Sequence, residues 1–305
     1  MKFNWQGVMP AVTTQFNSND ELDLDMFKVN IKAQLAAGVQ GIVLGGTLGE
    51  ASTLTEEEGR TLTRETVATV AGRIPVLMNI AEQTTKAAIA LAKSAKEDGA
   101  SGLMMLPPMR YKASDAEIVH YFKSVANSTS LPIMIYNNPV DYKLVVTLDM
   151  FQELLDACPN IQAVKESTRD TTNITRIKNR FGNRLAIMTG VDTLALESLV
   201  LGADGWVEGL VDAFPVETVA IYKLIKAGRV QEAITIYRWF MPLLELDIHP
   251  KLVQYIKMAA VYTGIGNEYV RAPRLVLEGA ERVRIEKVIT DALAIRPTLS
   301  DYKNL

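Results

Sequence analysis

Three side chains in this sequence could act together on a carbonyl group, and each stands at or just after the end of a short apolar run. Lys165 follows IQAV, Tyr136 follows PIMI, and Thr47 comes after GIVLGG. A lysine desolvated among apolar strands has a lowered pKa, so part of it is the free amine that attacks carbonyl carbon. A neighbouring tyrosine can pass protons to and from the carbinolamine. These residue types predict Schiff-base chemistry, provided that the fold brings them together.

Each of these features also has a structural interpretation. A lysine at a strand end commonly extends its ammonium to water, and a half-buried tyrosine commonly uses its hydroxyl as a polar handle. The segment GGTLGE, residues 45–50, could cradle a phosphate, but it has neither the dinucleotide-binding nor the Walker pattern. We therefore interpret its glycines as allowing the backbone to approach a small carboxylate.

The other polar residues near these runs are expected to have supporting roles. Glu50 and Glu166 could form an acid/base pair, but each precedes a predicted helix, where an acidic side chain stabilises the helix dipole. By the same reasoning Asp192 is predicted to be a helix N-cap. His120 lies within a helix-period segment and His249 has no evident partner, so neither is predicted to be catalytic.

The elements that must position these side chains alternate along the chain. Eight short apolar runs occur in order: VMPAVTT, GIVLGG, PVLMNI, GLMMLP, PIMIYN, IQAVKE, LAIMTG and DGWVEGL. Longer amphipathic segments such as TTKAAIALAKSAKEDG lie between them, with Asp, Ser or Thr at their starts. Apolar strands separated by amphipathic helices indicate a parallel sheet covered by helices. An open doubly wound sheet would give the same local pattern, but eight strands favour a (β/α)8 TIM barrel.

From about residue 215 the pattern is helical to the end of the sequence. We predict a barrel over residues 1–225 and a C-terminal helical extension over residues 226–305, packed on the barrel. In a barrel the functional groups lie on the strand ends and the loops that follow them.

Composition narrows the possible partners. The 305 residues carry 32 basic and 35 acidic side chains, a net charge of -3, which argues against nucleic acid or a polybasic membrane surface. One cysteine, Cys158, and two histidines make a disulfide framework or a metal site improbable. No run reaches the roughly 18 apolar residues of a membrane span. We expect a cytoplasmic protein that uses no metal or other cofactor and acts on a small molecule.

Three motifs in one order give a resemblance to a known family. G-T-x-G-E after the second run, Y-N-x-P after the fifth and V-K-E-S at the sixth resemble the dihydrodipicolinate synthase / N-acetylneuraminate lyase family over essentially the whole chain. The resemblance implies a (β/α)8 barrel with C-terminal helices, a Schiff base between lysine and a 2-oxo acid, and a homotetramer or homodimer.

The resemblance also implies roles for individual residues. It assigns the Schiff base to Lys165, proton transfer to Tyr136, the relay to Thr47, the carboxylate-holding backbone to Gly46 through Leu48, and the pocket wall to Gly190. We further expect Asp141 and Glu208, near the ends of the fifth and eighth runs, to contact the substrate.

Three departures from the synthase pattern bear on the substrate. Asp141 stands where the synthases carry an arginine for the second substrate's carboxylate, and an acidic residue there would repel that group. Met109 stands where the synthases lend a tyrosine to the neighbouring subunit, with Arg110 and Tyr111 just beyond it. Leu48 replaces the second threonine of the synthase motif.

YNNPVDY, DGWVEGLVDAFP and YRWFMPLLELDIHPKLVQYIK resemble a subgroup that acts in hydroxyproline catabolism. The resemblance implies dehydration and deamination of 1-pyrroline-4-hydroxy-2-carboxylate to 2,5-dioxopentanoate. Two alternatives stay open: a dihydrodipicolinate synthase or another pyruvate-dependent aldolase, and a non-catalytic 2-oxo-acid sensor, since fold alone does not guarantee turnover.

Overall fold

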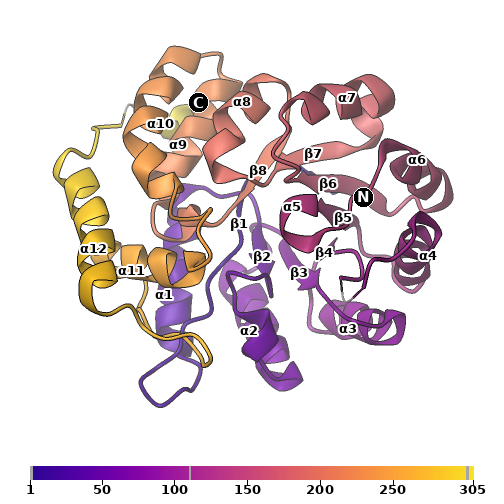
Figure 1. The fold of residues 1–305 in the computed structure, drawn as a ribbon, viewed down its shortest axis with the longest axis horizontal. Helices are drawn as coiled ribbons and strands as arrows, with labels where there is room; N and C mark the ends of the chain where they lie inside the picture. The colour runs from indigo at the N-terminus through magenta and orange to yellow at the C-terminus, as the bar shows by residue number, and fades with distance from the viewer. Residues whose placement is uncertain (1–2, 110, 300–301) are drawn as a thin grey trace.

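The computed structural model describes residues 3–109, 111–299 and 302–305, and its centre is a sheet of eight parallel strands (Figure 1). The strands are β1 (Gly7–Pro10), β2 (Ile42–Leu44), β3 (Val76–Ile80), β4 (Gly102–Met105), β5 (Ile133–Asn137), β6 (Ile161–Glu166), β7 (Ala186–Thr189) and β8 (Gly205–Glu208). They pair in the order β1-β8-β7-β6-β5-β4-β3-β2, and a parallel bridge between Ala11 and Val43 joins the two ends. The predicted barrel is therefore confirmed, and the open-sheet alternative is wrong.

A helix follows every strand and packs on the outside of the barrel. These helices are α1 (Leu24–Ala37), α2 (Glu56–Val70), α3 (Thr85–Glu97), α4 (Asp115–Ala126), α6 (Leu148–Ala157), α7 (Thr172–Phe181), α8 (Ala195–Val200) and α9 (Pro215–Lys226), with the one-turn α5 (Pro139–Tyr142) before α6. Several start at polar caps; Thr55 and Glu58, for example, form a capping box in which each side chain accepts from the backbone N–H of the other at the start of α2.

Three further helices lie together on one side of the barrel, next to α9 and α1 (Figure 1). They are α10 (Val230–Leu244), α11 (Leu252–Thr263) and α12 (Gly279–Ala294). This is the helical C-terminal part that the sequence predicts. A division into separate units near residue 226 stays a prediction.

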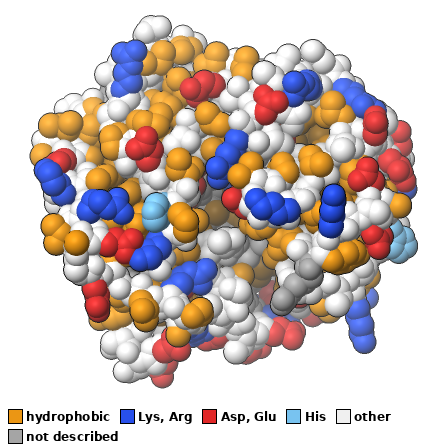
Figure 2. Space-filling model, in the orientation of Figure 1, with side chains coloured by type: hydrophobic (Ala, Val, Ile, Leu, Met, Phe, Trp, Pro, Cys, Tyr) orange, Lys and Arg blue, Asp and Glu red, His pale blue; other side chains and the backbone are white. Residues whose placement is uncertain are grey.

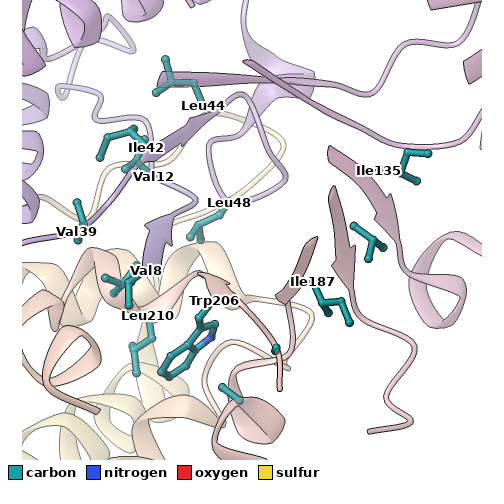
Figure 3. Packing of buried hydrophobic residues seen from close by; sticks show 14 of the residues in the cluster. Val8, Val12, Val39, Ile42, Leu44, Leu48, Ile135, Ile187, Trp206 and Leu210 are labelled. Atoms are coloured by element: carbon teal, nitrogen blue, oxygen red, sulfur yellow. The ribbon is translucent and has the colours of Figure 1, made fainter. Parts of the chain in front are cut away.

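Alternation along the strands separates two apolar cores. The larger one lies between strands and helices and includes Val8, Ile42, Ile187 and Trp206 (Figure 3). The smaller one fills the barrel with one residue from each strand: Met9, Val43, Leu77, Met104, Met134, Ala163, Met188 and Val207. Because successive side chains of a strand point to opposite faces, residues two positions further along point into the barrel as well. This packed layer closes the interior of the barrel, so a site can form only above or below it.

The surface offers no single-sign charged patch on the face that Figure 2 shows, where basic and acidic side chains are interspersed with apolar ones. Among the described residues no helix is long and apolar enough to cross a membrane, and no cluster of three or more acidic, histidine or cysteine side chains could hold a metal ion. Cys158 is a buried free thiol.

Candidate active site

A cavity of about 600 Å³ opens above the packed layer, at the carboxyl ends of the strands. Each strand contributes to it the residue two positions beyond its member of the inner core: Ala11, Gly45, Asn79, Leu106, Tyr136, Lys165, Gly190 and Gly209. Four of these eight are glycine or alanine, so this layer of the barrel is left hollow. The sequence therefore creates the cavity by placing small residues where other layers carry methionine, leucine and valine.

Gly190 shows how closely the hollow fits its lysine. A Cβ at this position would lie 2.3 Å from Ser167 Oγ and 2.5 Å from Lys165 Cε, far inside contact distance. Only glycine leaves room for the Lys165 side chain in this conformation. The predicted place of Gly190 in the pocket wall agrees with this geometry.

Lys165 and Tyr136 are brought together by the register of β5 and β6, in which they are direct partners. The Lys165 ammonium lies 4.3 Å from the centre of the Tyr136 ring, and the lysine is only 7% exposed. Burial lowers the pKa of Lys165, and the negative charge of Asp247 is the largest effect opposing this shift. Burial also raises the pKa of Tyr136 to about 12, so its hydroxyl keeps its proton at neutral pH. This pair combines an amine favoured in its free form with a protonated phenol, as carbinolamine chemistry requires.

Thr47 enters the cavity from the loop after β2. Its Oγ1 lies 3.2 Å from the hydroxyl of Tyr142, and either oxygen could donate the hydrogen bond. The backbone N–H groups of Gly46, Thr47 and Leu48 make no hydrogen bond within the described chain, so they are available to an anion. Leu48 lines the cavity while packing into the outer core (Figure 3). The predicted carboxylate-holding segment thus lies at the cavity, with free donors.

The loop after β5 is built by two successive asparagines. Asn137 Nδ2 donates to the Val146 carbonyl at 3.3 Å, and its Oδ1 accepts from the Val146 N–H at 2.9 Å. Asn138 caps α5 by accepting from the Asp141 N–H at 3.2 Å, while its Nδ2 donates to the hydroxyl of Tyr136 at 3.1 Å. With Pro139 at the first helical position, these bonds fix both ends of the loop. The Y-N-x-P motif is therefore explained as a device that holds Tyr136 and the residues after it.

Charged side chains surround the outer part of the cavity: Asp141, Arg169, Asp247 and Arg274, together with His249. Asp141 is exposed; it accepts from Asn138 Nδ2 at 2.7 Å and lies 3.7 Å from the Arg169 guanidinium. The predicted contact of Asp141 with substrate stays a prediction, and the position of the residue in the cavity wall allows it. The pocket presents both signs of charge to whatever lies beyond Lys165.

Asp247 is the carboxylate whose charge acts most strongly on Lys165. It comes from the segment between α10 and α11 and reaches the barrel because residue 209 has no side chain: a Cβ there would lie 2.2 Å from Asp247 Oδ1. In the described part of the chain its carboxylate accepts no hydrogen bond and forms no ion pair. Burial raises its pKa to about 6, with the positive charge of Lys165 acting in the opposite direction. A carboxylate without a protein donor is free to receive one from a ligand.

Glu208 does not lie where the sequence predicts. Val207 belongs to the inner core, so Glu208 points to the outer side of β8, and it is not among the residues that line the cavity. It is buried, and the negative charge of Asp192 adds to burial in raising its pKa well above the usual range. The geometry gives no support to a contact between Glu208 and substrate.

Three acidic residues have structural partners. The Asp192 carboxylate accepts from Trp206 Nε1 at 3.2 Å and from the N–H of Leu210 at 3.3 Å, so it links the loops after β7 and β8, and its prediction as an N-cap is wrong. Glu166 accepts from Asn173 Nδ2 at 2.9 Å. Glu50 forms a fully buried ion pair of 2.6 Å with Lys257 of α11. Neither glutamate lines the cavity, in agreement with supporting roles.

Several cavity residues were not predicted: Asn138, Tyr142, Arg169, Asp247, His249 and Arg274. Asn138 and Tyr142 lie within YNNPVDY, and the asparagine-proline start of a short helix is a signal that could have placed both at the strand end. His249, predicted to be uninvolved, lines the cavity; its Nδ1 accepts from the Lys251 N–H at 3.2 Å. Tyr111 does not line this cavity, and Arg110 lies outside the described residues.

Comparison with known proteins identifies the family of this chain. Residues 4–292 match the Dihydrodipicolinate synthetase family. The chain belongs to this family. It is 34% identical to the 4-hydroxy-tetrahydrodipicolinate synthase of Exiguobacterium sibiricum, over 90% of this chain and 92% of that one. It is 30% identical to the 4-hydroxy-tetrahydrodipicolinate synthase 1 of Halalkalibacterium halodurans, over 97% and 98% of the two chains.

Solved structures of the family superpose closely. The dihydrodipicolinate synthase of Bacillus anthracis matches with a TM-score of 0.90 at 28% identity, covering 95% of this chain and 99% of that one. A prophage protein of Escherichia coli from the dihydrodipicolinic acid synthase family, solved in complex with pyruvate, matches with a TM-score of 0.89 at 26% identity, with 95% and 99% covered. The chain is therefore an enzyme, a lyase of the type that uses a lysine Schiff base, and it acts on a small molecule.

Proposed function

We propose that the enzyme forms its Schiff base on Lys165 and that its substrate is 1-pyrroline-4-hydroxy-2-carboxylate, which it converts to 2,5-dioxopentanoate and ammonia. The observation that carries the Schiff base is the cavity layer itself: Lys165 is its only amine, lies 4.3 Å from the Tyr136 ring, and is desolvated. The substrate carboxylate would lie on the unpaired N–H groups of Gly46, Thr47 and Leu48.

The reaction balances with these residues. The free amine of Lys165 adds to C2 of the ring imine, and departure of the ring nitrogen opens the ring and leaves an iminium at C2. The iminium acidifies C3; when a C3 proton is removed, the C4 hydroxyl leaves with a proton as water. The unsaturated amine tautomerises to an imine at C5, which one water hydrolyses with loss of ammonia, and a second water releases Lys165. One water is consumed overall. Tyr136, protonated at neutral pH, is placed to exchange protons in the addition and elimination steps.

Two features of the outer cavity favour this substrate. Asp141, paired with Arg169, presents an acidic group where the synthases carry an arginine, so the carboxylate of a second substrate finds less attraction there. Asp247 offers an unpaired carboxylate, which suits the amine that ring opening sets free.

A second candidate is a 4-hydroxy-tetrahydrodipicolinate synthase, which condenses pyruvate with aspartate semialdehyde. The names of the relatives at 30% and 34% identity favour it. Against it stand the side chains at positions 141, 109 and 48, which are Asp, Met and Leu.

One set of assays separates the candidates. Borohydride added with pyruvate should trap a covalent adduct on wild-type enzyme and none on Lys165→Ala, as seen by intact mass and peptide mapping. The hydroxypyrroline carboxylate should release ammonia, while pyruvate and aspartate semialdehyde should condense negligibly. Condensation at ordinary enzyme rates without ammonia release would establish the synthase instead. Adduct formation without turnover of any acid tested would indicate a sensor.

We also propose that the enzyme works in the cytoplasm as a homotetramer or homodimer. The family resemblance supports the assembly, and light scattering at several protein concentrations would determine it. A monomer at all concentrations would contradict the proposal.

A further inference from the structure

Tyr142 lines the cavity with its hydroxyl group, and neither the motifs nor the comparisons assign it a role. It ends the one-turn helix α5, is half-buried, and lines the same cavity as Lys165. Its hydroxyl lies 3.2 Å from Thr47 Oγ1, and its ring meets the Tyr136 ring edge to face at 5.6 Å and 83°. Three hydroxyl-bearing side chains, from the loop after β2, from β5 and from the helix α5, thus lie beside the lysine.

We infer that Tyr142 is a positioning and proton-relay residue, which acts through Thr47 within the same chain to carry protons between the reaction centre and solvent. The inference rests on the Schiff-base role proposed for Lys165 and not on the identity of the substrate. It assigns the second phenol of the site to the loop after β5 of the same chain, and not to a neighbouring subunit.

The electrostatics of Tyr142 suit a relay. Burial raises its pKa to about 12, the nearby Tyr136 adds to this, and the hydrogen bond with Thr47 and the charge of Lys165 act the other way. The phenol therefore holds its proton at neutral pH and can donate it to Thr47. Thr47 is exposed, so the Thr47–Tyr142 pair lies between the buried lysine and the cavity mouth.

The relay moves a proton without a net change. Thr47 Oγ1 accepts a proton from the substrate and gives its own proton to the Tyr142 oxygen. Tyr142 in turn gives its proton to water at the mouth of the cavity. The reverse sequence returns a proton to the substrate carbon or to the leaving oxygen. Each oxygen ends with one proton, as it began.

The alternatives within the chain are poorer. Met109 lines the cavity but has no proton to give. Tyr111 is 54% exposed, lies outside this cavity and stands beside the Glu117 carboxylate. If a phenol from a neighbouring subunit served this site, Tyr111 would be the candidate, and the experiment includes it for that reason.

The loop is built to hold Tyr142 in place. The N-cap bond of Asn138, Pro139 at the first helical position and the two bonds between Asn137 and Val146 fix the segment on both sides of the tyrosine. Asn138 also donates to the Tyr136 hydroxyl. One residue therefore orients Tyr136 directly and Tyr142 through the helix that it caps. Such pre-ordering is what proton transfer at fixed geometry requires.

The test compares three variants of the full chain, each losing one hydroxyl: Tyr142→Phe, Tyr111→Phe and, as matched control, Tyr121→Phe. The Tyr121 hydroxyl is buried on α4, away from the cavity and without a hydrogen-bond partner in the described structure. The probe is pyruvate. Two quantities are measured: the rate at which the borohydride-trappable adduct forms, and the rate at which the C3 protons of bound pyruvate exchange with deuterium in D2O.

We expect Tyr142→Phe to lower the exchange rate by about 10²-fold and to slow adduct formation, while the final amount of adduct changes little. Tyr111→Phe and Tyr121→Phe should behave as wild type. A purely structural role for Tyr142 would instead reduce the amount of adduct and leave the exchange rate per adduct unchanged, which would overturn the inference. Exchange at the wild-type rate in Tyr142→Phe, with loss in Tyr111→Phe, would overturn it in favour of a neighbouring subunit.

The readouts also separate this inference from the proposed substrate. If the wild-type enzyme forms the adduct and exchanges C3 protons but releases no ammonia from the hydroxypyrroline carboxylate, the substrate proposal is wrong. The relay is then still tested by the exchange rate of Tyr142→Phe. If wild-type enzyme forms no adduct with any 2-oxo acid, both fail together, because Lys165 is then not the Schiff-base lysine.

Discussion

At the scale of single residues, the site depends on the absence of one side chain as much as on the presence of others. Gly190→Ala would place a methyl group 2.5 Å from Lys165 Cε and 2.3 Å from Ser167 Oγ. A shift of about 1 Å at a reacting group can cost about 10²-fold in rate. We therefore expect Gly190→Ala to lower kcat/KM by about that factor and to slow the formation of the adduct with pyruvate in parallel.

The matched control for Gly190 is Gly59→Ala on α2, where a Cβ meets nothing within 4 Å. This variant should keep full activity and gain up to about 1 kcal/mol of stability, because alanine favours a helix more than glycine does. Equal loss of activity in both variants would show that the cavity is not where we place it.

The charge of Asp247 should govern the pH dependence of Schiff-base formation. Burial lowers the pKa of Lys165, and Asp247 is the main group that opposes this. In Asp247→Asn the opposing charge is gone, so the pKa of Lys165 falls further and the rise of the adduct-formation rate with pH should move to lower pH.

The groups around Lys165 predict a graded series. Asp141 acts on Lys165 in the same direction but is the smaller and more exposed influence, so Asp141→Asn should give a smaller shift of the same sign. Stopped-flow adduct formation from pH 5 to pH 10 measures both. A profile unchanged in Asp247→Asn, with normal thermal stability, would remove Asp247 from the site.

The alternation of side chains between the two faces of each strand separates the correct residue predictions from the wrong one. Lys165 and Tyr136 were identified from their chemistry and from motif resemblance, and they lie together in the cavity. The position of Glu208 at the end of an apolar run predicts a contact with substrate, but Val207 faces inward, and so its neighbour Glu208 cannot. Asp247 could not be predicted, because nothing near it in the sequence shows that residue 209 must be glycine to admit it.

At the scale of elements, a buried ion pair connects the loop that carries Thr47 to the C-terminal helices. Glu50 Oε1 accepts from Lys257 Nζ of α11 at 2.6 Å, both side chains are fully buried, and the Arg271 N–H donates to the other carboxylate oxygen at 3.1 Å. Lys257→Met would leave the Glu50 charge without its main partner.

Removing one partner of a buried pair typically costs about 3–5 kcal/mol, so we expect a loss of that size in the free energy of unfolding by urea. The double variant Glu50→Gln with Lys257→Met should recover part of it. The exposed pair Lys287–Asp291 is the control, since replacing it by alanine should cost less than about 1 kcal/mol. A loss no larger than that of the control would mean that Glu50 is not held by this pair.

Elements were more predictable than contacts. Eight apolar runs became eight strands, because buried parallel strands need continuous apolar sequence. The helix α5 was not predicted, since four residues are too few for a periodic pattern, although Asn138 and Pro139 carry its start signal. The same four residues hold Tyr142, so the missed element and the missed site residue have one cause.

At the scale of the whole molecule, the C-terminal helices pack on the barrel through apolar and polar contacts of several kinds. Phe214, just before α9, meets the rings of Trp239 and Phe240 on α10 at 6.1 and 5.6 Å, and Trp239 Nε1 donates to the Ala292 carbonyl of α12 at 2.8 Å. Asp247 and Lys257 extend from the same helical part to the cavity and to the Thr47 loop.

These contacts predict that barrel and extension unfold together. In urea, the loss of helical circular dichroism and the loss of the ability to form the borohydride-trapped adduct should follow one transition with the same midpoint. If the predicted boundary near residue 226 separated independent units, the helical signal would fall in two steps. The adduct would then respond to the step that releases the extension, because Asp247 and the Glu50 partner leave the site with it. Two resolved transitions, with adduct formation surviving the first, would show instead that the barrel holds its site without the C-terminal helices.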